Sequence, residues 1–151
     1  MDINMREQQG FTLTELLITL AILGILSSVA LPSFVGQLKY NRLVSNTNQL
    51  QSVFKFARSE AAKRDKTVTL DENNGEWHVM IDGQVAALQK FQASHESISV
   101  SGLKDVVIAA TGEVNGNDND FLITDSDNST VDFCLQILIS GQVQRTKANR
   151  C

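Results

Sequence analysis

A long hydrophobic segment lies near the beginning of the chain. From Phe11 to Leu31 there are 21 residues, of which 14 are apolar and one, Glu15, is charged. The stretch from Leu16 to Leu26 is apolar on nearly every side of a helix, whereas a surface helix carries a single apolar stripe. At about 1.5 Å of rise per residue, a helix of this length spans roughly 31 Å, the thickness of a bilayer's hydrocarbon core. The pattern predicts a helix long enough to cross a membrane.

From Ser33 to Arg64 the pattern changes to that of an amphipathic helix. Apolar positions recur at helical spacing, and Glu60 stands one turn before Arg64, where opposite charges attract. The apolar stripe consists of Leu50, Phe54, Ala57 and Ala61. We therefore expect a helix from Phe11 to about Arg64 whose second half buries one face in a globular head.

After Asp65 the apolar positions alternate, as they do in β-strands. The clearest candidates are Thr67 to Leu70 and Glu76 to Ile81, the second ended by an Asp82-Gly83 turn. Further candidates are Val85 to Phe91, Ser97 to Ser101, Val106 to Ala110, Phe121 to Thr124 and Val131 to Ile139. The chain is therefore predicted to be α+β, with one long N-terminal helix packed on antiparallel β-sheet.

The composition of the chain excludes several classes of protein. With 151 residues it has the length of one domain. It carries 17 acidic and 13 basic side chains, a formal net charge of -4, and 42% of its residues are hydrophobic. The charge excludes a globally basic nucleic-acid binder, and the apolar fraction excludes a disordered chain.

The sequence contains no pattern typical of a metal site or a catalytic centre. His78 and His95 are 17 residues apart without a cysteine nearby. In an oxygen-rich patch, a calcium loop starting at Asp125 would need Gly and Glu where Thr130 and Gln136 stand. The patch consists of Asn117, Asp118, Asn119, Asp120, Asp125, Asp127 and Asn128. We predict solvated turns there, no metal, no cofactor and no enzymatic activity.

The hydrophobic segment has three interpretations: a core helix of a soluble domain, a cleaved signal peptide, or a retained membrane helix. Its apolar character on all sides disfavours the first. A signal peptide would be cut after Ser28-Val29-Ala30, but the charges of residues 1–10 and the terminal amine sum to zero, where a signal peptide is positive. A retained helix is therefore favoured. Translation from Met5 instead of Met1 would give this leader a charge of +1, and both starts remain open.

Glu15 requires an explanation because it is the one charge in the hydrophobic segment. An acidic side chain costs about 2.5 to 3.5 kcal/mol at the centre of a membrane helix, and less toward its ends. If the chain were cut after Gly10, the new amine of Phe11 would lie one helical turn from the Glu15 carboxylate. The carboxylate would then pair with its own terminus or with that of a neighbouring subunit, and only the second choice makes it an assembly device.

The segment Gly10-Phe11-Thr12-Leu13-Thr14-Glu15-Leu16-Leu17 resembles the processing site of type IV pilins and type II secretion pseudopilins. The resemblance continues to about Phe34, through Gly24 and Pro32, which stand where pilin helices carry a Gly and a Pro. It implies that a prepilin peptidase cuts between Gly10 and Phe11, that the new amine of Phe11 is methylated, and that Glu15 is the assembly glutamate.

Gly24 and Pro32 also weaken the helix physically. Glycine costs about 1 kcal/mol relative to alanine in a helix, and proline removes a backbone donor. The resemblance implies a helix that locally melts or extends during assembly, and a simple kink is the alternative. The domain organisation that follows is a prepilin leader at 1–10, a transmembrane and assembly helix at 11–32, and a periplasmic pilin-like head at 33–151.

Two segments of the head resemble one subfamily. Phe56-Ala57-Arg58-Ser59-Glu60-Ala61-Ala62-Lys63-Arg64, followed by a Val-Thr-Leu strand, resembles the helix end and first strand of GspH/FimT-type proteins, which include the minor pseudopilin H of type II secretion and the T- or U-type minor pilins. The segment from Cys134 to Gln144 is similar to their terminal hairpin, with a Gly in the turn. No resemblance is recognised for roughly 73–130.

The two cysteines are expected to form a disulfide. The predicted head lies in the oxidising periplasm, where two thiols pair. If Ser140-Gly141 is a two-residue turn, Cys134 faces the neighbourhood of Lys147, and the tail needs to reverse over only four residues to return Cys151. We therefore expect a Cys134–Cys151 bridge.

The family resemblance implies a minor pilin, a structural subunit of the tip or initiation complex of a type IV pilus. Its expected location is the cell inner membrane and then the filament, and its expected partners are that membrane, the prepilin peptidase, and other minor and major pilins or pseudopilins. One alternative is the minor pseudopilin H of the type II secretion pseudopilus. Another is a DNA-binding competence pilin that uses the basic tail residues Arg145, Lys147 and Arg150. Gln142 and Gln144 stand where such relatives carry Arg, and three cations give only weak, salt-sensitive binding.

Overall fold

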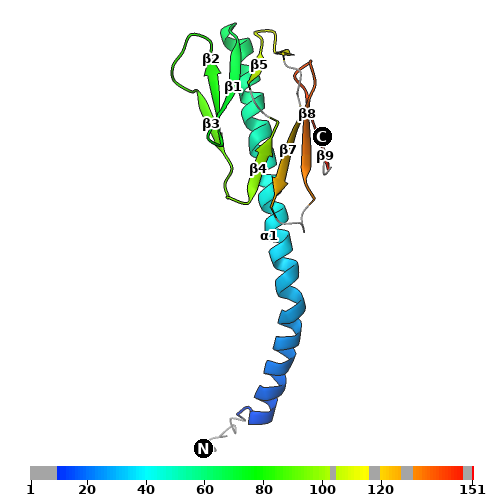
Figure 1. Cartoon of the computed structure of the whole chain (residues 1–151). Coiled ribbons are helices and arrows are strands. Elements are labelled where there is room, and N and C mark those ends of the chain that lie inside the picture. The colour runs from blue at the N-terminus through cyan, green and yellow to red at the C-terminus, as the bar shows by residue number, and fades with distance from the viewer. Residues whose placement is uncertain (1–9, 103–104, 116–119, 127–130, 148–150) are drawn as a thin grey trace, which may run out of the picture. The chain divides into compact units, whose positions relative to one another are not determined.

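The computed structural model describes residues 10–102, 105–115, 120–126, 131–147 and 151. Its contacts divide the chain into two units, residues 1–37 and 38–151, and each is described by itself. One long helix, α1 (Leu13–Arg64), forms the first unit from Leu13 on and the beginning of the second (Figure 1). The predicted division at residues 32 and 33 stays a prediction.

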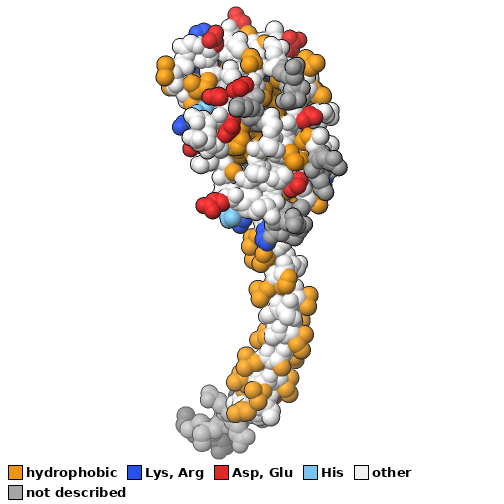
Figure 2. Space-filling model, viewed as in Figure 1, with side chains coloured by type: hydrophobic (Ala, Val, Ile, Leu, Met, Phe, Trp, Pro, Cys, Tyr) orange, Lys and Arg blue, Asp and Glu red, His pale blue; other side chains and the backbone are white. Residues whose placement is uncertain are grey.

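In the first unit, α1 presents apolar side chains on all sides. Figure 2 shows hydrophobic side chains along the visible face of this part of the helix. Among the described residues, α1 is the one helix long and apolar enough to cross a membrane, and none of its membrane-length window is buried in the protein. A soluble core helix would be buried, so the apolar surface requires lipid or another chain to cover it.

The second unit consists of the rest of α1 and two antiparallel sheets. One sheet has the strand order β3-β2-β1-β5-β6, and the other has the order β4-β7-β8-β9. The strands are β1 (Val68–Asn73), β2 (Glu76–Ile81), β3 (Gln89–Gln92), β4 (Ile98–Ser101), β5 (Val106–Ile108), β6 (Val114–Asn115), β7 (Asp120–Asp125), β8 (Phe133–Ile137) and β9 (Val143–Lys147). The predicted α+β class, one long helix on antiparallel sheet, is confirmed.

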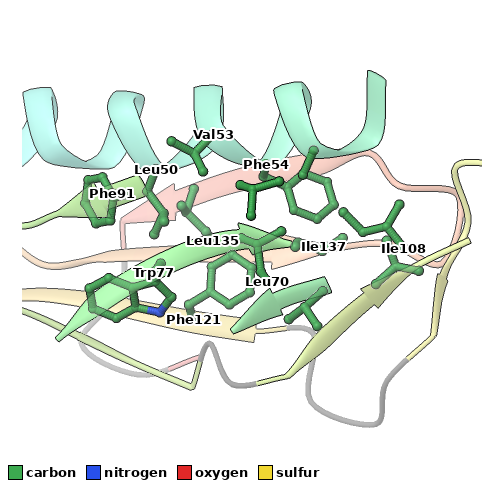
Figure 3. Packing of buried hydrophobic residues seen from close by; sticks show 14 of the residues in the cluster. Leu50, Val53, Phe54, Leu70, Trp77, Phe91, Ile108, Phe121, Leu135 and Ile137 are labelled. Atoms are coloured by element: carbon green, nitrogen blue, oxygen red, sulfur yellow. The ribbon is translucent and has the colours of Figure 1, made fainter. Parts of the chain in front are cut away.

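The core of the head lies between the second half of α1 and both sheets. Figure 3 shows Leu50, Val53 and Phe54 pointing from the helix toward side chains of the strands. The predicted stripe is confirmed, because its four members are at most 2% exposed. On the strand side the largest fully buried residues are Leu70, Phe91, Ile108, Phe121, Ile123, Phe133, Leu135 and Ile137. Burial of such side chains contributes about 1.5 to 3 kcal/mol each, which holds the helix on the sheets.

Several predicted strands are longer than the observed ones, and the one expected over Val106 to Ala110 ends at Ile108. The strand expected from Val85 begins only at Gln89, and the Val85 side chain is 98% exposed. An isolated β-branched residue with no sheet partner gains nothing from the extended form, so the connection after β2 stays irregular. The long strand expected to reach Ile139 ends at Ile137, and the two-residue strand β6 was not predicted.

The register of the terminal hairpin also differs from the expectation. Cys134 pairs with Thr146, not with Lys147, because the loop between Leu138 and Gln142 has three residues instead of two. The Leu138 N–H donates to the Gln142 carbonyl at 2.9 Å, and Gly141 has a φ of 74°. Three-residue hairpin loops require a left-handed residue at this position, and glycine adopts it without a Cβ penalty.

Candidate functional site

The start of α1 is closed by a capping box formed by Thr12 and Glu15. The Glu15 carboxylate accepts hydrogen bonds from the backbone N–H and the hydroxyl of Thr12, both at 2.9 Å, and the Glu15 N–H contacts Thr12 Oγ1 at 3.3 Å. This exchange satisfies donors that a helix leaves unpaired in its first turn. Thr-x-x-Glu ahead of an apolar run is the sequence signature of such a box, so a signal for this local role of Glu15 existed and was overlooked.

The two residues flanking the predicted cleavage point, Gly10 and Phe11, precede α1 and are exposed. The Phe11 side chain is 89% exposed. Cleavage there would create an amine one residue before Thr12, whose backbone N–H the Glu15 carboxylate already contacts. The remaining leader, residues 1–9 with both candidate start methionines, lies outside the described residues.

Gly24 and Pro32 both lie inside α1, which continues through them to Arg64. A Cβ built on Gly24 would meet nothing within 4 Å, so no packing in the described part of the chain requires glycine there. Pro32 has no N–H to donate to the carbonyl of Ser28. Their predicted roles in assembly remain predictions.

The C-terminal end of the head is fastened by a disulfide between Cys134 and Cys151, the pair that the sequence predicts. Cys134 lies on β8 and is 6% exposed. The bridge closes a loop with a sequence separation of 17 and so ties the end of the chain to the sheet that carries β9.

The two described cations of the basic tail contact aromatic rings. The Arg145 guanidinium lies 5.1 Å from the ring centroid of Phe133 and donates to Asn48 Oδ1 at 3.1 Å. The Lys147 ammonium lies 5.4 Å from the ring centroid of Tyr40. Both side chains therefore attach β9 to β8 and α1, and Arg150 lies outside the described residues.

The oxygen-rich patch is described only at Asp120 and Asp125, which begin and end β7, and its other members lie outside the described residues. His78 Nε2 lies 3.1 Å from Glu76, and His95 Nδ1 lies 2.9 Å from the Ser97 hydroxyl. Within the described ranges no group of three or more His, Cys, Asp or Glu residues is placed to hold a metal ion.

Two glutamates of the head have shifted pKa values. Glu60 accepts a hydrogen bond from Arg64 Nε at 2.7 Å and lies 3.6 Å from Lys63 Nζ, which confirms the predicted Glu60–Arg64 pair. The hydrogen bond from Arg64 is the largest cause that holds the pKa of Glu60 below its ordinary value, and the charges of Lys63 and Arg64 add to it. Desolvation of the carboxylate acts in the opposite direction and is outweighed. Hydrogen bonding to His78 and then the charge of Lys90 lower the pKa of Glu76.

The contacts of Arg58 could not be read from the sequence, which shows only that this residue lies on a polar face of the helix. Its Nη1 donates to the Gly141 carbonyl at 3.2 Å, across 83 residues of sequence. Its side chain also lies beside Gly112, in the turn between β5 and β6. Together with Lys55 it lines a pocket of about 360 Å³ beside this turn.

Comparison with known proteins agrees with the fold and the N-terminal motif. Residues 5–31 match the model of the prokaryotic N-terminal methylation motif. The type IV minor pilin FimU of Pseudomonas aeruginosa has the same fold, with a TM-score of 0.61 and 17% identity over 75% of this chain and 97% of that chain. A second crystal form of FimU gives a TM-score of 0.56 and 16% identity over 71% of this chain and 98% of that chain. These likenesses give the chain a type IV pilin-like fold with an N-terminal segment that matches the methylation motif.

A match over the head identifies the family of the chain more narrowly than the fold does. Residues 46–144 match the model described as type II transport protein GspH, and the chain belongs to that family. The type IV major fimbrial protein FimA of Dichelobacter nodosus is 34% identical over 62 residues, which is 39% of each chain. A second FimA from that organism is 40% identical over 48 residues, 30% of this chain and 31% of its own. The chain thus matches only about two fifths or less of the length of these curated relatives.

Proposed function

We propose that the protein is a minor pilin, a structural subunit of a type IV pilus and not an enzyme. The observation that carries the proposal is the α1 segment before Gln37, where large apolar side chains are 45% or more exposed and which lies mostly within the match to the methylation motif at residues 5–31. An apolar surface of this extent is stable only in lipid or among other apolar helices. A filament subunit meets both environments, first in the inner membrane and then in the pilus.

In this proposal the prepilin peptidase cuts between Gly10 and Phe11, and the Phe11 amine is methylated. The amine remains positively charged, so a carboxylate in the same apolar layer stabilises it. Glu15 supplies that carboxylate to a neighbouring subunit during assembly. Before assembly, the hydrogen bonds from Thr12 satisfy the carboxylate within its own chain. The head then contacts other minor pilins, major pilins or pseudopilins.

The test is the mass and location of the native protein. Intact-mass analysis of the protein from sheared filaments should give a chain that begins at methylated Phe11. Glu15→Ala should be cut normally but be absent from filaments, whereas Gly10→Lys should remain uncut. A mature chain that begins elsewhere would refute the processing, and normal recovery of Glu15→Ala in filaments would refute the assembly role.

The GspH family match over the head favours a second candidate, the minor pseudopilin H of type II secretion. The two candidates share the fold and the processing and differ in the filament that contains the subunit. Deletion of the gene should abolish piliation in the first case and secretion of folded exoproteins in the second. Intact piliation together with lost secretion would reject the pilus assignment.

A further inference from the structure

A pocket with two cations lies between α1 and the turn of the β5–β6 hairpin. Its volume is about 360 Å³. The pocket is lined by Lys55, Arg58, Ser59, Ala62, Thr111 and Gly112. The four helix residues are spaced at i, i+3, i+4 and i+7, so they share one face of the helix, and the hairpin forms the opposite wall.

The guanidinium of Arg58 is held in place by two glycine turns. It donates to the Gly141 carbonyl, and a Cβ on Gly112 or on Gly141 would lie 2.9 or 2.7 Å from its Nε. Only residues without a side chain leave room for it there. Among the described residues, the Gly141 carbonyl is its one hydrogen-bond acceptor, so most of its five donors are available to a ligand.

The two cations of the pocket differ in their partners from those at the end of α1. Lys63 and Arg64 both contact the Glu60 carboxylate, whereas no carboxylate in the described part of the chain lies within ion-pair distance of Lys55 or Arg58. The chain as a whole is acidic, with a net charge of -4. Two cations without a carboxylate on an acidic protein form a local site for an anion.

We propose that this pocket binds the carboxylate of an Asp or Glu side chain on the head of a neighbouring pilin-like subunit, an inference that rests on the proposed function. A planar guanidinium fits a carboxylate with two parallel hydrogen bonds, and the Lys55 ammonium adds a point charge one turn away. The Ala62 methyl group offers an apolar wall to the methylene groups of the incoming side chain.

A nucleic acid fits the pocket less well. Tight binding of a polyanion requires a row of cations along the backbone, and this pocket holds two. The pocket therefore suits a single carboxylate.

The test uses charge reversal in the full-length protein in cells that assemble the filament. Lys55 is exposed and has no hydrogen bond or ion pair with a described residue, whereas Arg58 also holds Gly141, so Lys55→Glu is the informative variant. It should lower recovery in sheared filaments about tenfold at equal cellular levels, because a like charge then faces the partner's carboxylate. The matched control, Lys66→Glu just after α1, changes an exposed lysine that has no ion pair with a described residue, and it should be recovered like the unchanged protein.

A photo-crosslinking amino acid at position 111 identifies the partner. It should capture a surface segment of another pilin-like subunit that contains an Asp or Glu, and changing that acid to Lys should restore Lys55→Glu to filaments. Equal recovery of Lys55→Glu and Lys66→Glu, capture of a segment without an acid, no capture at position 111, or absence of rescue would each overturn the proposal. A Lys55→Glu protein that enters filaments normally but no longer retains DNA would also overturn it. Absence of the unchanged protein from filaments would instead overturn the proposed function, and this inference with it.

Discussion

Asn46 and Ser94 bind each other through two hydrogen bonds. The Asn46 side-chain amide donates to the Ser94 hydroxyl at 2.8 Å, and Asn46 Oδ1 accepts from the Ser94 backbone N–H at 2.9 Å. Asn46 lies on α1 and is 1% exposed, and its amide also donates to the Arg42 carbonyl at 2.9 Å. The pair therefore joins the helix to the connection between β3 and β4 through a fully satisfied buried amide.

Asn46→Ala should lower the free energy of unfolding by about 2 kcal/mol, because it leaves the Ser94 N–H without its acceptor. The measurement is urea denaturation of the full-length protein in detergent micelles. Asn48→Ala makes the same chemical change at an exposed position on the same helix, and it should cost less than about 1 kcal/mol. Equal losses for the two variants would show that the Ser94 contact is not the cause.

Gly141→Ala should destabilise the head more than Gly83→Ala. Both glycines have a positive φ, 74° and 81°, so each alanine pays about 1 kcal/mol for the left-handed backbone. At Gly83 the new Cβ meets nothing within 4 Å, but at Gly141 it would overlap the Gly112 carbonyl oxygen and lie 2.7 Å from Arg58 Nε. The crowding should add about 2 kcal/mol in denaturation experiments, and similar midpoints for the two variants would contradict it.

Periodicity predicted the elements of this fold because burial decides them. The stripe from Leu50 to Ala61 and the alternation in β2 both report which side chains avoid water, and both match the structure. The hairpin register was wrong because two- and three-residue loops containing Ser140-Gly141 have nearly the same sequence signal. The choice between them depends on the left-handed conformation of Gly141.

The pocket around Arg58 could not be predicted for a different reason. Its two glycine neighbours lie far along the chain, in turns of different sheets, and helical spacing shows only that Arg58 is on a polar face. The N-terminal motif is local, so its residues were identified from the sequence. Arg58 and Gly141 become neighbours only after both sheets have packed on α1.

Removal of the disulfide should lower stability by about 3 kcal/mol, the chain-entropy value for a closed loop of this size. A reducing agent should therefore shift the urea midpoint of the unchanged protein to lower concentration. The double variant Cys134→Ala/Cys151→Ala should start at the lower midpoint and not respond to reductant. A midpoint that is the same in all four conditions would mean that the bridge does not stabilise the head.

Glu60 predicts a pH dependence of stability. Because the folded-state pKa of this carboxyl is lowered, chiefly by the Arg64 hydrogen bond, its contribution is present above the ordinary value of 4.5 and is lost as pH falls through the folded-state pKa. Glu60→Gln should therefore be less stable than the unchanged protein at about pH 7, and the difference should shrink below about pH 4.5. Glu96→Gln, at an exposed carboxylate, is the control for general charge effects. A Glu60→Gln difference that stays constant with pH would refute the linkage.

Substitutions of Arg145 distinguish a structural role of the basic tail from a role in nucleic-acid binding. Its guanidinium stacks on Phe133 and donates to Asn48, two contacts that together contribute about 1 kcal/mol at an exposed site. Arg145→Gln should therefore lower the free energy of unfolding by about that amount. Arg145→Lys should restore less than half of the stability that Arg145→Gln loses, because an ammonium lacks the planar group that can stack and donate at the same time.

If the tail binds DNA instead, both Arg145→Gln and Lys147→Gln would weaken retention of the full-length protein on a DNA fragment in a salt-dependent way. Weakened retention with unchanged stability would reassign these side chains to a nucleic-acid surface.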